Sequence, residues 1–179
     1  MADDEVDPAP ELDFWSFIEL AGRRLREHGF GDGLATQVLL TLNRASDIVT
    51  YDLEAAVHRP RGRSWSAFRL LFVTWLAGPL EAKKAAELTG MSRAAVSALS
   101  KPLVAEGLLR RTPDERDRRA VLLSLTERGR REMAATFEAQ RRRELEWTSV
   151  LTETEQRILV MLLDKLITDR HQFDVRGRR

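Results

Sequence analysis

Cysteine is absent from the 179-residue chain, which excludes disulfide bonds, thiol redox sensing and thiolate metal sites. Histidine is scarce: His28, His58 and His171 lie far apart and form no ligand motif. A zinc site built from them is the less favoured alternative, and we expect no metal and no cofactor. Neither a Gly-rich phosphate loop nor a nucleophile motif is present, so the chain is not expected to be an enzyme.

Long apolar runs are also lacking, and none approaches the length of a membrane span. The acidic N-terminus has no apolar segment of the kind found in signal peptides. We therefore expect a soluble, cytoplasmic protein without a membrane partner. Residues 1–12 are acidic and contain Pro8 and Pro10, which predicts a disordered tail.

Charge is distributed unevenly along the chain, although the net charge is only +1. Residues 1–60 carry 12 acidic and 5 basic side chains, residues 61–131 carry 7 and 15, and residues 132–179 carry 9 of each. A basic middle section suggests one surface that meets a polyanion. Ordinary solvated charge on an arginine-rich protein is the alternative, and composition alone does not separate the two.

Helical periodicity dominates the flanks of the chain. Helices are expected over Phe14–Glu27, capped by Asp13, and over Leu34–Val57, followed by a turn at His58–Arg63. Aromatic residues then mark the apolar face of a helix that stops at Gly78: Trp65, Phe68, Phe72 and Trp75, followed by Leu76. After the middle section, Thr126 is expected to cap a helix over 127–147, and a capping box, Thr152-x-x-Glu155, opens the last one.

The middle section predicts two short helices joined by a tight turn and followed by a hairpin. Leu80–Leu88 and Ser92–Glu106 are the helices, and Thr89–Met91 is the turn. Strands over Leu108–Thr112 and Val121–Thr126 flank a tip rich in arginine. A hairpin with arginines at its tip fits a DNA minor groove, so we interpret residues 61–126 as a winged helix-turn-helix that binds DNA.

The second helix is the expected recognition helix, because its N-terminal end can enter the major groove. Val96, Leu99 and Leu103 are expected to point inward, which leaves an outward face that comprises Arg93, Ala94, Ser97, Ala98 and Lys101. We expect Arg93 to contact guanine, Ser97 and Lys101 to reach bases or phosphates, and Ser92 to offer N–H groups to a phosphate. Pro102 lies inside this helix and is expected either to kink or to interrupt it, which affects Lys101 most.

These segments resemble the multiple antibiotic resistance regulator (MarR) family. The resemblance rests on Ala85–Leu88, Met91–Arg93, Glu106–Arg111, Asp117–Arg119 and Leu125–Gly129, whose order and spacing match across about residues 60–130. It implies a mainly helical protein with a small β-hairpin wing. Helices at 13–60 and 127–179 would interlock two copies into a homodimer on a pseudo-palindromic operator, most often as a repressor.

The resemblance also implies roles at the wing tip. In the family an arginine enters the minor groove and an aspartate orients it, and these roles correspond here to Arg119 and Asp117. Arg116 and Arg118 are expected to contact phosphates. A solvated tip balanced by its acidic residues is the alternative for these side chains.

Family members commonly respond to small aromatic anions. The N-terminal helix with Trp15 resembles the urate-responsive branch of the family. The four positions that bind urate in that branch correspond here to Trp15, Arg69, Leu99 and Arg111, and only Trp15 and Arg111 are the residue type found there. Urate is therefore the less favoured ligand, and a small aromatic anion is expected near Trp15, Phe68, Arg69 and Arg111. A core role is the alternative for Trp15. A winged module that binds only protein is the rival function, and the basic wing argues against it.

Overall fold

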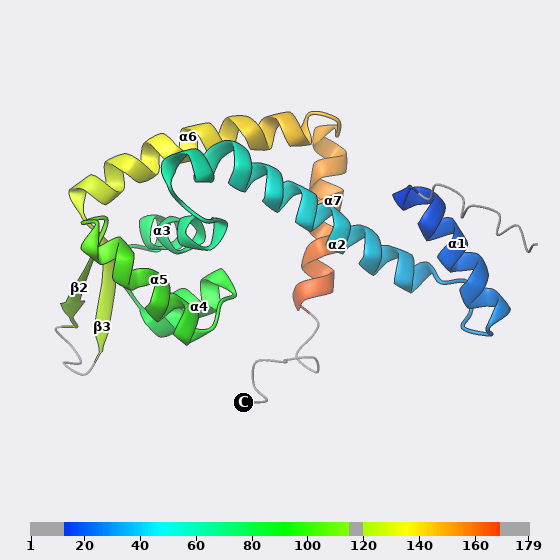
Figure 1. Ribbon diagram of the computed structural model, residues 1–179, viewed down its shortest axis with the longest axis horizontal. Coiled ribbons are helices and arrows are strands. Elements are labelled where there is room, and N and C mark those ends of the chain that lie inside the picture. Colours follow the sequence, from blue (N-terminus) through cyan, green and yellow to red (C-terminus); the bar gives the residue numbers. More distant parts are fainter. Residues whose placement is uncertain (1–12, 115–119, 169–179) are drawn as a thin grey trace, which may run out of the picture. The chain divides into compact units, whose positions relative to one another are not determined.

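A computed structural model describes residues 13–114 and 120–168. The acidic tail, the wing tip at 115–119 and the C-terminal residues 169–179 lie outside the described residues. The described part is mainly helical with three short strands (Figure 1). Its elements in chain order are α1 (Phe14–Glu27), α2 (Leu34–Leu53), η1 (Glu54–His58), η2 (Arg59–Arg61), α3 (Trp65–Ala77), β1 (Leu80–Glu81), α4 (Ala82–Thr89), α5 (Arg93–Ala105), β2 (Leu109–Pro113), β3 (Val121–Leu125), α6 (Glu127–Thr148) and α7 (Glu153–Thr168).

The chain forms two compact units, Met1–Asp52 and Leu53–Arg179. In the first unit, Asp13 caps α1 as expected, because its carboxylate accepts a hydrogen bond from the Ser16 amide at 2.7 Å. Ile18 is the buried residue of α1, and the Arg44 guanidinium of α2 lies 5.8 Å from the centre of the Phe14 ring. The two helices of this unit leave much of their apolar surface exposed.

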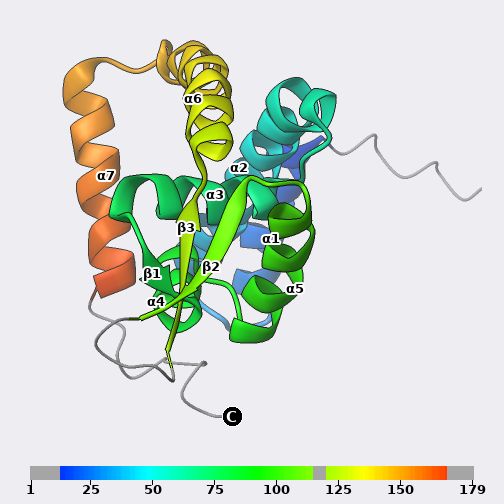
Figure 2. The same cartoon turned by 90° about the vertical axis from the view of Figure 1, so that its left-hand side faces the viewer.

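The second unit contains the main hydrophobic core. Residues from α3, α4, α5, the sheet and α6 form it, and the most completely buried are Leu70, Ala85, Val96, Leu108, Leu109 and Leu123. Figure 2 shows the three strands alongside α3, α4 and α5, with α6 continuing from the end of β3. The expected helix-turn-helix and wing are therefore both present.

The sheet corrects one expectation. Leu80 and Glu81 do not begin a helix but form β1, which pairs antiparallel with β3 at Leu123 and Leu122. The order is β1-β3-β2, so the wing hairpin has a third strand along its base. Strand pairing satisfies the backbone groups of these two residues, and α4 begins only at Ala82.

The recognition helix is not interrupted, so one of the two alternatives for Pro102 is wrong. α5 runs from Arg93 to Ala105 with Pro102 inside it, and the amide of its C-cap residue Glu106 bonds to the Pro102 carbonyl at 2.9 Å. Gly107 follows with φ of 71°, a conformation that glycine adopts without strain. Proline has no backbone N–H, so one hydrogen bond of this helix is missing. The loss of that bond does not end the helix.

The aromatic residues of α3 are core residues, as expected. Trp65, Phe68 and Phe72 stack along the helix with centroids 5.4 and 5.5 Å apart, and Phe137 of α6 stacks on Phe72 at 5.3 Å. Leu76 is the exception, because it is exposed rather than part of this face.

The expected turn after the long helix is helical over most of its length. η1 is a π-helix and η2 a 3₁₀ turn, so the helical path continues to Arg61. His58 is fully buried there and stacks on Phe68 with ring centres 4.2 Å apart. A single-turn π segment is uncommon and often marks a functional position.

α6 and α7 complete the described chain. The Thr126 hydroxyl accepts from the Gly129 amide at the start of α6, and the Thr152–Glu155 capping box opens α7, both as expected. None of the residues of α7 is buried. In the part of the chain that the structure describes, no helix combines the length and apolarity needed to cross a membrane.

Candidate nucleic-acid interface

The turn between α4 and α5 is built by local hydrogen bonds. Gly90 ends α4 in the left-handed region at φ of 72°. The buried Thr89 hydroxyl donates to the Ala85 carbonyl at 2.6 Å and accepts from the Met91 amide at 3.3 Å. Ser92 then caps α5 by accepting from the Ala95 amide at 3.1 Å. These bonds fix the direction in which α5 leaves the turn.

The core fixes the rotation of α5 about its axis. Val96, Ser100 and Leu103 are buried, whereas Arg93, Ala94 and Lys101 are exposed and Ser97 is half-buried. Within residues 13–114 and 120–168, neither Arg93 nor Lys101 forms an ion pair with a carboxylate at the distances that define one. Both cations are therefore available to an external anion, and Arg93, as the first residue of α5, lies next to the N-terminal amides of the helix.

The base of the wing is a regular antiparallel hairpin. Leu109 of β2 faces Leu125 of β3, and Pro113 faces Val121. The Arg110 guanidinium donates to the Ser124 hydroxyl at 2.9 Å, and the Asp114 amide bonds to the Ala120 carbonyl at 3.0 Å. The four expected DNA contacts of the tip, Arg116, Asp117, Arg118 and Arg119, lie outside the described residues.

Further cations lie on α4 and β2, the two elements that pack against the recognition helix on either side of it in sequence. Lys83 and Lys84 of α4 are exposed, as is Arg111 of β2. Lys84 donates to the Glu87 carboxylate at 2.8 Å, and this hydrogen bond holds the pKa of Glu87 below its ordinary value. The arrangement offers charge-assisted donors to phosphates and one exposed helix end that fits a major groove.

The four expected effector residues occupy different environments. Trp15 is 60 % exposed in the first unit, so within that unit it is not a core residue. Phe68 is 4 % exposed and belongs to the aromatic stack of α3. Arg69 is half-buried, and Arg111 is exposed on β2.

Two features of this region were missed by sequence reasoning. Arg63 lies between Glu106 at the end of α5 and Glu132 of α6, at 2.5 and 3.1 Å. Gly129 of α6 packs against the Leu108 carbonyl. No local pattern indicates either contact, because the partners are 21 to 69 residues apart in sequence.

Comparison with known proteins agrees with this geometry. Residues 64–121 match the model of the MarR family. The chain is 33 % identical over 137 residues to an uncharacterized HTH-type transcriptional regulator, YwaE, of Bacillus subtilis (strain 168), covering 76 % of this chain and 80 % of that protein.

Two solved structures are similar at 26 % identity. A probable transcriptional regulator from Pseudomonas aeruginosa aligns over 75 % of this chain and 99 % of its own, with a TM-score of 0.65. The transcriptional repressor CouR, solved on a 23-mer DNA duplex, aligns over 75 % and 94 %, with a TM-score of 0.67. The chain therefore belongs to the MarR family of transcriptional regulators, which bind DNA and are not enzymes.

Proposed function

We propose that the protein is a homodimeric repressor that binds a pseudo-palindromic operator and is released by a small aromatic anion. The observation that carries the DNA-binding part is the exposed N-terminal end of α5. Among the described residues, no carboxylate pairs with Arg93, and the core fixes the rotation of the helix that carries it. Arg93 would donate to guanine, and Ser97 and Lys101 would contact bases or phosphates farther along the groove. Ser92 and Ala94 would approach the backbone at the helix N-terminus.

The wing would supply the second set of contacts. β2 and β3 project as a hairpin with Arg116, Arg118 and Arg119 in the connecting segment. Arg119 would enter the minor groove with Asp117 as its orienting partner, and the other two arginines would neutralise phosphates. The similar repressor CouR was solved bound to a 23-mer DNA duplex, which supports binding of duplex DNA by this chain.

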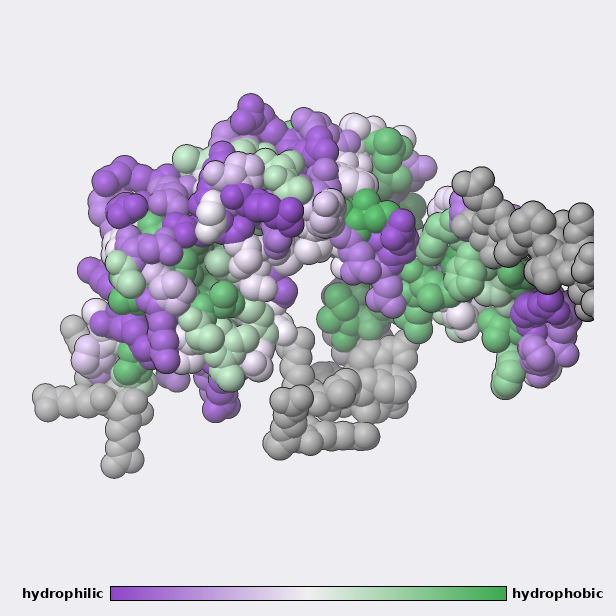
Figure 3. All heavy atoms as spheres, viewed as in Figure 1, coloured by the Kyte–Doolittle hydropathy of each residue, from purple (hydrophilic) through white to green (hydrophobic). Residues whose placement is uncertain are grey.

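A second copy of the chain would cover the apolar surfaces of both ends. α7 has no buried residue, and its exposed apolar residues are Ile158, Leu159, Val160, Met161, Leu162 and Ile167. Apolar residues are also exposed on α1 and along α2, and Figure 3 shows apolar surface over the first unit and over α7. Two-fold pairing would bury such surface and place two recognition helices about one DNA turn apart.

An anionic effector would meet Arg69. Its guanidinium is half-buried and has no carboxylate partner among the described ion pairs. A partly desolvated guanidinium binds a carboxylate strongly, so an aromatic carboxylate that also contacts the edge of Phe68 or Arg111 would complete the site. Benzoate and its hydroxylated derivatives are the first compounds to test. Arg69→Ala should remove their effect on DNA binding and leave DNA affinity unchanged.

Selection from random duplexes tests the central proposal. The wild-type protein should enrich an imperfect palindrome and protect it in a footprint. Arg93→Ala should then cost about 1–3 kcal/mol on that duplex and much less on a scrambled duplex. Failure of the wild-type protein to enrich any sequence would overturn sequence-specific binding, whereas equal losses on both duplexes would make Arg93 a phosphate contact.

A further inference from the structure

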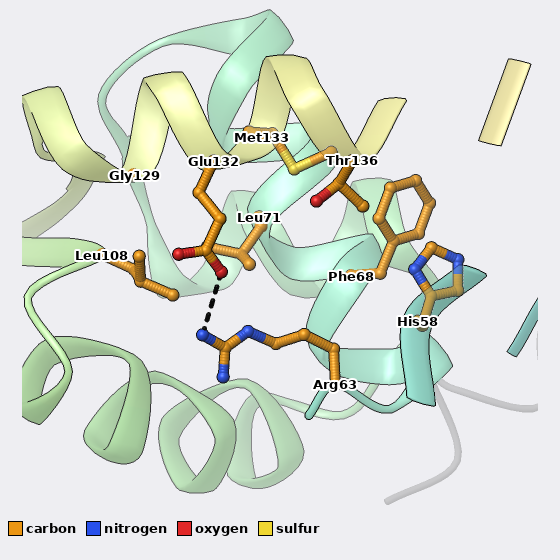
Figure 4. Close-up of a pocket in the computed structure, with 9 residues that line it drawn as sticks. All are labelled: His58, Arg63, Phe68, Leu71, Leu108, Gly129, Glu132, Met133 and Thr136. Carbon is orange, nitrogen blue, oxygen red and sulfur yellow. Dashed lines mark hydrogen bonds and ion pairs between the residues drawn. The ribbon is translucent and has the colours of Figure 1, made fainter. Parts of the chain in front are cut away.

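One guanidinium connects three elements of the second unit. Arg63 lies between η2 and α3, and only 14 % of its side chain is exposed. One terminal nitrogen lies 2.5 Å from the Glu106 carboxylate at the end of α5, and the other lies 3.1 Å from the Glu132 carboxylate of α6. Figure 4 shows the Arg63 side chain extending toward Glu132. The end of the recognition helix is thereby joined to the helix that leaves the wing.

The end of α5 needs such support. Pro102 removes one backbone hydrogen bond in the final turns of the helix, which weakens the segment that Glu106 caps. Two cations from outside α5 hold that segment: Arg63 binds the Glu106 side chain, and Arg128 of α6 donates to the Glu106 carbonyl at 3.0 Å. Both stand at the C-terminus of the helix, where its dipole favours positive charge.

Burial makes the Arg63 contact demanding. Its side chain lines a small cavity with Phe68, Leu71, Leu108 and Met133, and its Nε atom has no hydrogen-bond partner among the described residues. A guanidinium in such surroundings is costly unless its carboxylates are in place. The ion pairs are therefore expected to hold one geometry rather than a range of them.

A small tilt of α5 would matter at its other end. Arg93 stands 13 residues before Glu106, which is about 20 Å along the helix. A tilt of about 5° at the Glu106 end would move Arg93 by roughly 1.7 Å, more than a bidentate hydrogen bond to a base tolerates. A contact that fixes the tilt of α5 therefore also fixes whether Arg93 can reach its base.

We propose that Arg63 is a positioning residue for base recognition: by pairing with Glu106 and Glu132 it sets the angle between α5 and α6 without touching DNA. The inference rests on the proposed sequence-specific binding. If Arg63 has this role, the ratio of the affinities for operator and random DNA depends on a residue that lies away from the groove, and not only the folding of the protein does.

The test uses full-length protein, the duplex that the wild type selects from a random library, and a scrambled duplex of equal length. Arg63→Met retains an unbranched apolar side chain in place of the aliphatic part of arginine and removes the guanidinium group. We expect the affinity ratio of the two duplexes to fall by about 3–30-fold, the range of long-range coupling effects. The salt dependence of binding should not change, because Arg63 neutralises no phosphate in this arrangement. Arg63→Lys should recover part of the ratio.

Glu106→Gln is the second variant, because it leaves the Arg63–Glu132 pair intact. If Arg63→Met does not fold, Glu106→Gln alone tests the positioning role. Arg131→Met is the matched control: Arg131 pairs with Glu127 on the exposed surface of α6, so its replacement should not alter the ratio. Thermal unfolding and oligomeric state are measured alongside, and DNA binding is measured where each variant is folded.

A purely structural role would lower stability but leave the affinity ratio of the folded variant unchanged. An unchanged ratio in Arg63→Met and Glu106→Gln, or equal losses on the two duplexes, would overturn the inference. If the wild-type protein selects no duplex, the proposed function fails instead, and the two failures are distinct.

Discussion

A single glycine determines how closely α6 approaches the base of the wing. The Thr126 amide and hydroxyl bond to the Leu108 and Gly107 carbonyls at 2.9 and 2.6 Å, which draws the start of α6 against the loop after α5. A Cβ atom at Gly129 would overlap the Leu108 carbonyl and lie 3.1 Å from Cδ2 of Leu125. Glycine is required here by space rather than by backbone conformation.

Gly129→Ala should therefore destabilise the protein, although alanine is the better helix former. Overpacking of this kind costs about 1–3 kcal/mol, and a clash with backbone lies at the upper end. Urea unfolding at fixed protein concentration measures it. Gly22→Ala on α1 is the control, since its Cβ would have nothing nearer than 3.8 Å and should add about 0.5–1 kcal/mol. Equal stability changes in the two variants would contradict the packing argument.

His58 predicts a dependence of stability on pH. Burial lowers the pKa of its imidazole below the ordinary value, and Arg61 acts in the same direction. Gln140 and Glu54 oppose the shift, and both ring nitrogens lack a partner at hydrogen-bonding geometry among the described residues. Arg63 and Glu132 line the same cavity. The folded state thus favours the neutral ring.

The direction of the effect follows from proton uptake. The unfolded chain binds a proton at His58 near pH 6.5, and the folded chain binds it only at lower pH. The contribution of His58 to the free energy of unfolding is therefore complete above about pH 6.5 and is lost as the pH falls below it. His58→Phe, which keeps the aromatic stack, should remove this component of the pH profile between about pH 8 and 5.5. His28→Gln, at an exposed helix end, should keep it. Identical profiles for wild type and His58→Phe would refute the assignment.

At the scale of elements, the wing predicts the ionic behaviour of DNA binding. Replacing Arg118 and Arg119 by alanine should weaken binding and flatten the log–log salt dependence by roughly 0.9 for each phosphate that is no longer neutralised. The same double substitution at the exposed Arg141 and Arg142 of α6 removes equal charge and should leave the slope unchanged. Fluorescence anisotropy across a salt series measures both. A wing variant that retains the wild-type slope would exclude phosphate contacts by these arginines.

Elements with local signals could be predicted from sequence. The caps at Asp13, Ser92, Thr126 and Thr152 each place a side-chain oxygen within three residues of the amide that it binds, so the pattern is visible along the chain. The exposed face of α5 follows from helical periodicity in the same way. Its DNA contacts stay predictions.

Elements fixed by distant partners could not be predicted. β1 exists because Leu80 pairs with Leu123, 43 residues later, and its two residues are too few to show a strand pattern. The π segment depends on how His58 packs against Phe68 and α6, which no local propensity encodes. Glu106 and Glu132, whose carboxylates pair with Arg63, lie 43 and 69 residues after it in the sequence. An arginine in a polar turn is ordinarily exposed, so its burial could not be predicted.

At the scale of the whole molecule, charge and apolar surface are separated. Residues 61–131, which contain the recognition helix and the wing, carry 15 basic against 7 acidic side chains, whereas residues 1–60 carry 5 against 12. The exposed apolar residues concentrate instead in α1, α2 and α7. This separation fits a protein that meets DNA with its middle section and another protein surface with its ends.

Breaking the apolar face of α7 should therefore separate the proposed dimer and weaken operator binding together. Leu159 and Leu162 lie one turn apart on α7 and are about half exposed. Leu159→Asp with Leu162→Asp would place two carboxylates in the interface, where they have no partner, and the chain should sediment as a monomer. A monomer engages one half-site, so operator affinity should fall by about 10²–10⁴-fold, the gain that linked binding provides.

Arg157→Asp is the control, because it removes only the exposed ion pair with Glu153 on the same helix and should leave the dimer intact. A doubly substituted chain that stays dimeric would show that α7 does not carry the interface. A monomer with wild-type operator affinity would show that pairing is not needed to bind DNA.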